Sequence, residues 1–350
     1  MGQYQAEIKA VYGDTASGAD ITKNDRGNRQ VVTLTPNPNA AIQATIKKFW
    51  AALARKTQYT VAFDEETLIA EAIIKLNQIA IYDNEIAITS NLINELRQDT
   101  AQAEYLYSAS VKVQAQYAPL DMIEEISEQA GLNYSTVLKV IKRIDKSQLI
   151  KNPPKFTQAA IQILRAEVLA SLLRKLEYTV TDETIPFDFN AAIELSVANE
   201  RVVNTPNKGV YDKMVIDSNL ERDFAIDADS HIQSEIVCFL KLPASYKIPI
   251  PKIFNQDAHY EPDFGIVLKQ KKRFEAAEEN YYFVVEVKGT NTLNDKAALT
   301  EAEKFKIECA IRHFAALGIT LKPEALSQQS YIAPIKTYDI FKNQALNLIS

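Results

Sequence analysis

The residues of this sequence best suited to chemistry are Asp263, Glu286 and Lys288, each beside or within an apolar stretch. Asp263 comes directly before residues 264–268, and Glu286 and Lys288 end the stretch that starts at Tyr281. Side chains alternate along a strand, so Glu286 and Lys288 should share one face. If the two stretches pair as strands, Asp263 should meet both residues at one end of a sheet.

Two carboxylates and a lysine in this arrangement predict a site that hydrolyses a phosphodiester with the help of a metal ion. Mg²⁺ takes one or two carboxylates together with waters and substrate phosphate, and Mn²⁺ suits the same ligands. The ion would lower the pKa of an attacking water, and Lys288 would orient that water or stabilise the oxyanion. The alternative is a salt-bridge cluster at a strand end, because Pro-Asp and Glu-x-Lys are short motifs that also occur by chance.

The elements that must position these residues follow from apolar spacing and from capping residues. Strands are predicted at residues 59–63, 232–242, 260–268 and 281–288. Helices are predicted at residues 40–56, 65–76, 156–176, 218–227 and 297–317. Asp64 should cap the second of these helices, and Gly318 should close the last. The fold expected from these elements mixes α and β structure.

Residues 120–150 have the pattern of a helix-turn-helix, with a helix at 122–130, Gly131 in the turn and a second helix at 135–144. If this pair binds DNA, its second helix would place four residues in the major groove: Ser135, Thr136, Lys139 and Lys142. The favoured interpretation is a structural helix pair with solvated lysines, because many helical hairpins share this pattern.

The composition narrows the class of protein. The net charge of −6 argues against a surface that grips nucleic acid everywhere, but it is compatible with a local basic groove. No Gly-rich phosphate loop occurs, so no ATP site is expected. The apolar runs are too short to predict a membrane span, and no secretory signal is recognisable. The two cysteines, Cys238 and Cys309, are interpreted as buried thiols, and the protein is expected to be cytoplasmic.

Several motifs together resemble, in order, the C-terminal nuclease module of type III restriction enzyme subunits. They are DSNLERDFA at 217–225, FLKLPASYKIP at 239–249, YEPDFG at 260–265, YFVVEVKG at 282–289 and EKFKIECAIRHF at 303–314. Upstream, residues 49–50, 56–59 and 63–64 resemble the segment between the helicase motor and the nuclease of that family. The resemblance covers most of the chain from about residue 42.

This resemblance implies an α/β (α+β) restriction-endonuclease-like core of the PD-(D/E)xK type. It implies that Asp263, Glu286 and Lys288 are catalytic, that Mg²⁺ is the cofactor and that duplex DNA is the substrate. The helicase motifs of the family are missing, so the chain resembles the C-terminal part of such a subunit. The implied partners are a helicase motor, as a region or a separate chain, and a methyltransferase subunit that recognises the DNA sequence.

The resemblance also bears on residues of less certain role. Glu221 falls where the family has an acidic residue, which makes it an additional candidate metal ligand beside Asp263 and Glu286. However, residues 218–221 also form a capping box, and both interpretations stay open. Lys306 matches the family and would reach a phosphate, whereas His313 is interpreted as a packed structural residue. Basic residues at the hairpin tip are weak candidates for contacts with DNA phosphates: Lys269, Lys271, Lys272 and Arg273.

We therefore expect three regions: an N-terminal arm and helical linker at 1–118, a helical connector with the helix-turn-helix at 119–200, and the nuclease domain at 201–350. The domains before residue 201 are expected to be mostly helical. Two alternatives remain at this stage. One is a non-catalytic DNA-binding or docking module with a nuclease-like fold, and the other is a related repair nuclease.

Overall fold

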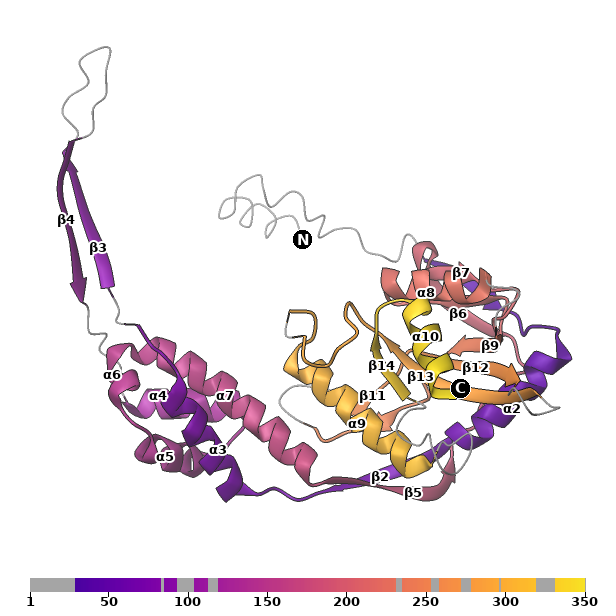
Figure 1. Cartoon of the computed structure of the whole chain (residues 1–350), viewed down its shortest axis with the longest axis horizontal. Helices are drawn as coiled ribbons and strands as arrows, with labels where there is room; N and C mark the ends of the chain where they lie inside the picture. Colours follow the sequence, from indigo (N-terminus) through magenta and orange to yellow (C-terminus); the bar gives the residue numbers. More distant parts are fainter. Residues whose placement is uncertain are drawn as a thin grey trace, which may run out of the picture.

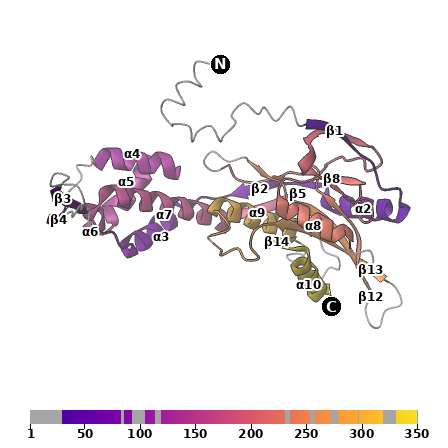
Figure 2. The ribbon, with the colours of Figure 1, turned by 90° about the horizontal axis from the view of Figure 1, so that it is seen from above.

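The computed structural model describes residues 29–82, 85–92, 104–112, 119–230, 235–252, 258–271, 278–295, 297–318 and 331–349. Residues 1–28 of the predicted N-terminal arm lie outside them. Helices and strands mix throughout, as the sequence predicted. Figure 1 shows two parts: a group of helices, α3 to α7, and a sheet with the helices that cover it. The view from above shows the same elongated arrangement (Figure 2).

The sheet has four strands in the order β14-β13-β12-β9. Their bounds are Ile236–Lys241 for β9, Phe264–Lys271 for β12, Glu278–Val287 for β13 and Tyr331–Ile335 for β14. Strand β12 is antiparallel to both β9 and β13, and β14 runs parallel to β13. Because β12 and β13 are antiparallel, the residues just before β12 and the residues at the end of β13 lie at the same end of the sheet, as the sequence predicted.

Helices cover both faces of this sheet, which explains why its strands are apolar on both sides. On one face, α8 (Asn219–Ser230) and α10 (Tyr338–Ile349) bury a cluster in which Phe224 stacks on Phe264 and Phe283 meets Phe341. The buried aromatic rings of this cluster make the first face of the sheet a core.

The second face is covered by α2 (Ala40–Leu53) and α9 (Glu301–Leu317). Phe49 of α2 stacks on Tyr282 of β13 with ring centroids 5.4 Å apart. Gly265 allows this close approach, because a Cβ added there would lie 2.5 Å from the Phe49 ring. Helix α9 begins with a capping box of Thr300 and Glu303 and ends at Gly318, whose φ is 56°.

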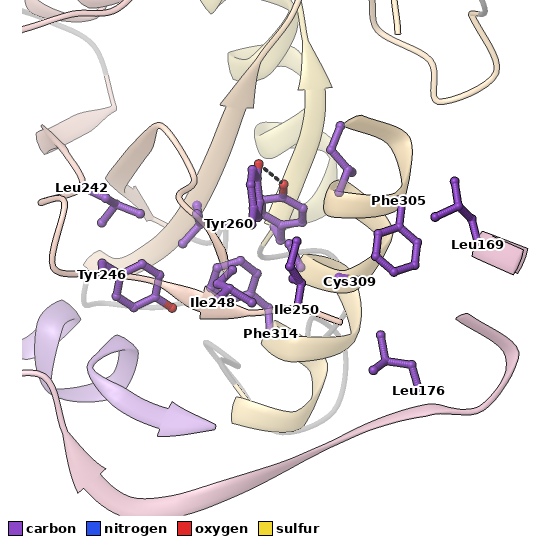
Figure 3. Close-up of a cluster of buried hydrophobic side chains, with 14 of the residues drawn as sticks. Leu169, Leu176, Leu242, Tyr246, Ile248, Ile250, Tyr260, Phe305, Cys309 and Phe314 are labelled. Carbon is purple, nitrogen blue, oxygen red and sulfur yellow. Dashed lines mark hydrogen bonds between the residues drawn. The ribbon is translucent and has the colours of Figure 1, made fainter. Parts of the chain in front are cut away.

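Paired strands hold these helices in place. Strand β1 (Arg29–Leu34) pairs with β6 (Ile193–Ala198), and β2 (Arg55–Val61) pairs with β5 (Leu176–Thr184). Two shorter pairs are β7 (Val202–Asn204) with β8 (Lys213–Val215), and β10 (Ile248–Pro249) with β11 (His259–Tyr260). Figure 3 shows Tyr246, Ile248 and Phe314 in the apolar cluster between the β10 segment and α9.

These strand pairs correct the predicted division of the chain. Residues 29–61 and 176–198 were expected in mostly helical domains, but they form strands, with α2 between two of them, and pack against the sheet and α9. The 3-10 turn at Asn199–Arg201 then leads directly into β7. The predicted boundaries at 118 and 200 therefore do not coincide with the packing, because each strand pairs with a segment far away in the sequence.

The separate group of helices comprises α3 (Glu65–Gln78), α4 (Pro119–Ala130), α5 (Tyr134–Arg143), α6 (Ser147–Lys151) and α7 (Pro153–Arg174). The ribbon of β3 (Glu85–Leu92) and β4 (Glu104–Lys112) extends from it (Figure 1). Helix α7 is long and apolar enough to cross a membrane by length and composition, and 56 % of its most apolar window is buried inside the molecule. That burial is the pattern of a core helix.

Helices α4 and α5 form the predicted pair, with Gly131 in the left-handed conformation at the turn. Helix α3 covers part of the α5 face that would contact DNA if this pair bound it. Thr136 is buried and its hydroxyl donates to Glu65 at 2.6 Å, and the Lys139 ammonium lies 3.0 Å from the same carboxylate. These contacts fit the interpretation of the pair as a structural unit.

Candidate active site

Asp263 lies just before β12 and is held there by hydrogen bonds to the backbone of the two neighbouring segments. Its carboxylate Oδ2 accepts the backbone N–H of Val287 at 2.8 Å, and its carbonyl oxygen accepts the N–H of Leu242 at 2.9 Å. The first bond joins Asp263 directly to the end of β13. The structure thus places Asp263 beside the strand that carries Glu286, as the sequence predicted.

Glu286 and Lys288 lie on the same side of β13. The Lys288 ammonium is 3.1 Å from Glu286 Oε1 and 3.8 Å from the Glu303 carboxylate. Glu286 is only 3 % exposed, and its second oxygen, Oε2, has no hydrogen-bond partner of ordinary geometry among the described residues. A buried carboxylate oxygen without a partner is costly, so a ligand at this position would be favourable.

The pKa shifts of Asp263 and Glu286 also favour a bound cation at this position. Burial and the neighbouring Glu286 hold the pKa of Asp263 well above its ordinary value, against the opposing effect of Lys241. Burial also raises the pKa of Glu286, although Lys288 and the Tyr260 hydroxyl lower it. Burial lowers the pKa of Lys288, but the attraction of Glu286 outweighs it and the pKa is raised overall. For both carboxylates, the nearby lysines therefore do not offset the effect of burial on the pKa.

These features fit a bound Mg²⁺. Asp263 and Glu286 supply two buried carboxylates, one with an unpartnered oxygen, and Mg²⁺ needs no more protein ligands than that. In the part of the chain that the structure describes, no three His, Cys, Asp or Glu side chains converge into a closed metal cage. An ion held here would therefore keep positions for water and for a substrate phosphate.

Lys241, at the end of β9, is a site residue that the sequence analysis did not identify. Its ammonium contacts the Glu221 carboxylate, lies 2.7 Å from Asp217 and lies 3.7 Å from Asp263 Oδ1. The signal was available, because Lys241 ends an apolar strand as Lys288 does. Only the pairing of β9 with β12, however, brings Lys241 beside Asp263.

Tyr260 is a second residue that the sequence analysis did not assign. It is buried, and its hydroxyl shares a hydrogen bond of 2.8 Å with the hydroxyl of Tyr331 (Figure 3). Burial, with the nearby Glu286, raises the pKa of Tyr260 well above its ordinary value. The two neutral tyrosines of this pair therefore lie close to Glu286, and the Glu-Pro-Asp motif that follows Tyr260 was the only hint in the sequence.

Glu221 takes part in the cap of α8 and also lines the cavity at the candidate site. Its backbone N–H donates to Ser218 Oγ at 3.2 Å, and its carboxylate accepts the N–H of Asp217 at 3.1 Å. This resembles the predicted capping box, but the backbone N–H that Glu221 accepts belongs to Asp217, while Ser218 donates through its hydroxyl at 3.2 Å. Lys241 lies between Glu221 and Asp263, so the structure does not bring Glu221 into direct contact with the other two carboxylates.

A cavity of about 420 Å³ opens above these residues. It is lined by Asp217, Glu221, His259, Tyr260, Glu261, Asp263, Glu286, Lys288, Glu303 and Lys306. Lys306 therefore faces the candidate site, as the sequence analysis expected.

The basic residues predicted at the hairpin tip follow the far end of β12, away from Asp263. Lys271 ends β12, about 24 Å from Phe264 at the usual rise per residue. Lys272 and Arg273 lie outside the described residues.

His313 of α9 is a structural residue. It is buried, with its ring nitrogens 2.8 Å from the Thr57 hydroxyl and 3.1 Å from the Tyr246 hydroxyl. Burial lowers the pKa of His313 to about 3. A neutral, fully bonded imidazole cannot serve as a general base here, and its bonds tie α9 to β2 instead.

Comparison with known protein families agrees with this geometry. Residues 207–329 match a family model described as an endonuclease domain. That segment contains α8, strands β9, β12 and β13, and α9, with Asp263, Glu286 and Lys288 among its residues. Searches of curated proteins and of solved structures found no match to the chain. Residues 207–329 thus form a restriction-endonuclease-like module, which indicates a nuclease.

Proposed function

We propose that this chain is a metal-dependent endonuclease that hydrolyses phosphodiesters of duplex DNA at Asp263, Glu286 and Lys288. The observation that carries the proposal is the buried, unpartnered Oε2 of Glu286 beside Asp263, inside a module that matches an endonuclease domain. Mg²⁺ bound there would activate a water and offset the charge that grows on the phosphate. Mn²⁺ would substitute for it.

The residues of the chain divide the remaining work. The Val287 N–H fixes the orientation of the Asp263 carboxylate, so that its other oxygen points away from the strand. Lys288 is anchored by Glu286 and is still 29 % exposed at its side chain, so its ammonium can donate to a water or to a phosphate oxygen. We infer that Lys288 orients the attacking water.

The acidic cavity also explains why the reaction would depend on a cation. A phosphate entering beside Asp217, Asp263 and Glu286 meets several carboxylates and only a few ammonium groups. Lys306 lines this cavity and Lys241 lies 3.7 Å from Asp263 Oδ1, so both are suited to hold non-bridging oxygens. Without a bound ion, repulsion from the carboxylates would oppose binding of the phosphate.

We further propose that the chain serves as the nuclease part of a type III restriction subunit. The motifs at 217–225, 260–265, 282–289 and 303–314, in that order, support this assignment. A helicase motor and a methyltransferase subunit would then be its partners, and the methyltransferase would choose the DNA sequence. The isolated chain should accordingly nick DNA slowly, without sequence preference and without a response to ATP or S-adenosylmethionine.

The experiment is nicking of supercoiled plasmid by the full chain in Mg²⁺ or Mn²⁺, together with titration of Mn²⁺ binding. Asp263→Ala, Glu286→Ala and Lys288→Ala should each abolish nicking, and the two carboxylate variants should also weaken Mn²⁺ binding. Glu177→Ala, a change at an exposed position of β5, is the matched control and should leave both unchanged.

Full nicking by any of the three site variants would sink the assignment of these residues. A wild-type chain that binds DNA but neither binds the metal nor nicks plasmid would instead be a non-catalytic docking module. ATP-stimulated cleavage would contradict the expected absence of a nucleotide site.

A further inference from the structure

A second cavity, of about 510 Å³, adjoins the acidic one. The two share Asp217, Glu261 and Asp263 in their linings, so they meet at the candidate catalytic carboxylate. A volume of this size lies within the range of small-molecule sites. The second cavity is therefore a candidate binding site that borders the chemistry.

The walls of the second cavity are mainly apolar. Leu240 and Leu242 come from the end of β9, Leu34 and Leu195 from the paired strands β1 and β6, and Phe187 from the segment before β6. Such walls suit the faces of a flat, apolar ring. Most other lining residues away from the mouth are apolar as well.

The mouth of this cavity is charged. Asp217, Glu261 and Asp263, which also line the acidic cavity, stand there with Lys241, whose ammonium lies 3.7 Å from Asp263 Oδ1; Lys213 is the other charged lining residue. An occupant with a phosphate attached to its ring could place the phosphate at Lys241 and Asp263 while its ring entered the apolar interior. The mouth and the interior together define the chemistry of the occupant.

Tyr211 supplies an independent sign of a missing partner. It lines the cavity, it is 7 % exposed, and its hydroxyl has no hydrogen-bond partner among the residues described. Burial raises the pKa of Tyr211 to about 12, so the hydroxyl stays neutral and can donate. A buried hydroxyl without a partner is costly, and a small shift of the Tyr211 side chain on binding would let a ring with polar atoms at its edge satisfy it.

We propose that this cavity receives one nucleobase of the DNA, taken out of the base stack, from the nucleotide next to the phosphate that is cut. The inference rests on the proposed function for the position of that phosphate. A nucleobase has apolar faces, polar edges and a phosphate at the distance of one sugar, which are the three properties that the cavity combines. Extruding a base costs least where the DNA is mismatched or single-stranded. The chain therefore prefers unpaired DNA at the point of cleavage.

The experiment compares two single-stranded probes in Mg²⁺, both with phosphorothioate linkages that resist cleavage: an octamer of thymidylate, and an abasic octamer with the same number of linkages. The full wild-type chain should bind the thymidylate octamer about tenfold more tightly, because burying a base adds affinity that an abasic backbone lacks. Leu195→Trp, which fills the cavity, should lose this preference. Val31→Trp, on the exposed side of β1 outside the cavity, is the matched control and should keep it.

Tyr211→Phe provides a second test that removes only the hydroxyl and should reduce the preference without abolishing it. Equal binding of both octamers by the wild type, or an unchanged preference in Leu195→Trp, would overturn the proposal. Thymidine monophosphate binding as tightly as the octamer would also overturn it, since the site would then serve a free nucleotide. Plasmid nicking is measured separately: normal nicking without a base preference refutes only this inference, whereas absent nicking refutes the proposed function.

Discussion

Neutralising Asp263 should stabilise the metal-free protein while destroying its proposed activity. The substitution Asp263→Asn keeps the shape of the side chain and retains an oxygen that can accept the Val287 N–H. Lys241 loses one anionic neighbour but keeps Glu221 and Asp217. The change therefore removes a single charge with little disturbance of the packing.

The sign of the stability change depends on which electrostatic effect dominates. At 3.7 Å, the attraction between Lys241 and Asp263 is about 4 kcal/mol for an effective dielectric constant of roughly 20. Burial and repulsion from Glu286 nevertheless keep the pKa of Asp263 above its ordinary value, so they exceed that attraction. Removing the charge should raise the free energy of unfolding by about 1–2 kcal/mol at neutral pH in EDTA.

The pH dependence follows from the same shift. Because the pKa of Asp263 is raised in the folded state, the folded chain holds this proton to higher pH than the unfolded chain does. The wild type therefore loses stability as pH rises from the ordinary aspartate pKa through the raised one. Asp263→Asn lacks this loss, so its advantage should vanish in acid and be complete above the raised pKa.

Magnesium should reverse the order of stability. A ligand that binds only the folded state at a hundred times its dissociation constant adds about 2.7 kcal/mol, and Asp263→Asn should gain little of this. Urea unfolding in EDTA and in Mg²⁺ measures both effects, with Asp182→Asn, a change at an exposed position, as control. Nicking by Asp263→Asn should fall by about 10²–10³-fold. A variant that is less stable than wild type in EDTA, or that gains equally from Mg²⁺, would refute the reasoning.

Four other substitutions test the surroundings of the site. Ser218→Ala should cost about 0.5–2 kcal/mol of stability through the lost cap, whereas Glu221→Gln should keep the cap bond and lower Mn²⁺ affinity only if Glu221 is a ligand. His313→Gln should make the free energy of unfolding depend less on pH in acid. Because the pKa of His313 is about 3 in the folded chain, the wild type loses up to about 1.4 kcal/mol per pH unit below the ordinary histidine pKa. Urea unfolding at several pH values measures this difference. Gly265→Ala should lower the urea midpoint by the equivalent of about 1–3 kcal/mol, because its Cβ would meet the Phe49 ring at 2.5 Å; an unchanged midpoint would show that α2 can shift.

The positions of Asp263, Glu286 and Lys288 could be predicted from sequence because they depend on local rules. Alternation along β13 puts Glu286 and Lys288 on one side, and a hairpin between β12 and β13 leaves few ways to arrange Asp263. The helix ends were equally local, since the Asp64 cap and the Gly318 terminus both appear in the structure. Their chemical roles are a further step, which the metal and nicking experiments address.

Lys241 and the packing of α2 and β5 could not be predicted in this way, because both depend on contacts between distant segments. Strand β2 shows its β-branched pattern openly, but nothing within residues 55–61 indicates that its partner is β5. The family match, which begins at residue 207, likewise omits α2, although Phe49 stacks on Tyr282 within the matched sheet. The endonuclease module is therefore completed by residues that precede it. A core strand must bury both faces, and here one of those faces is closed by a helix that lies outside the recognisable domain.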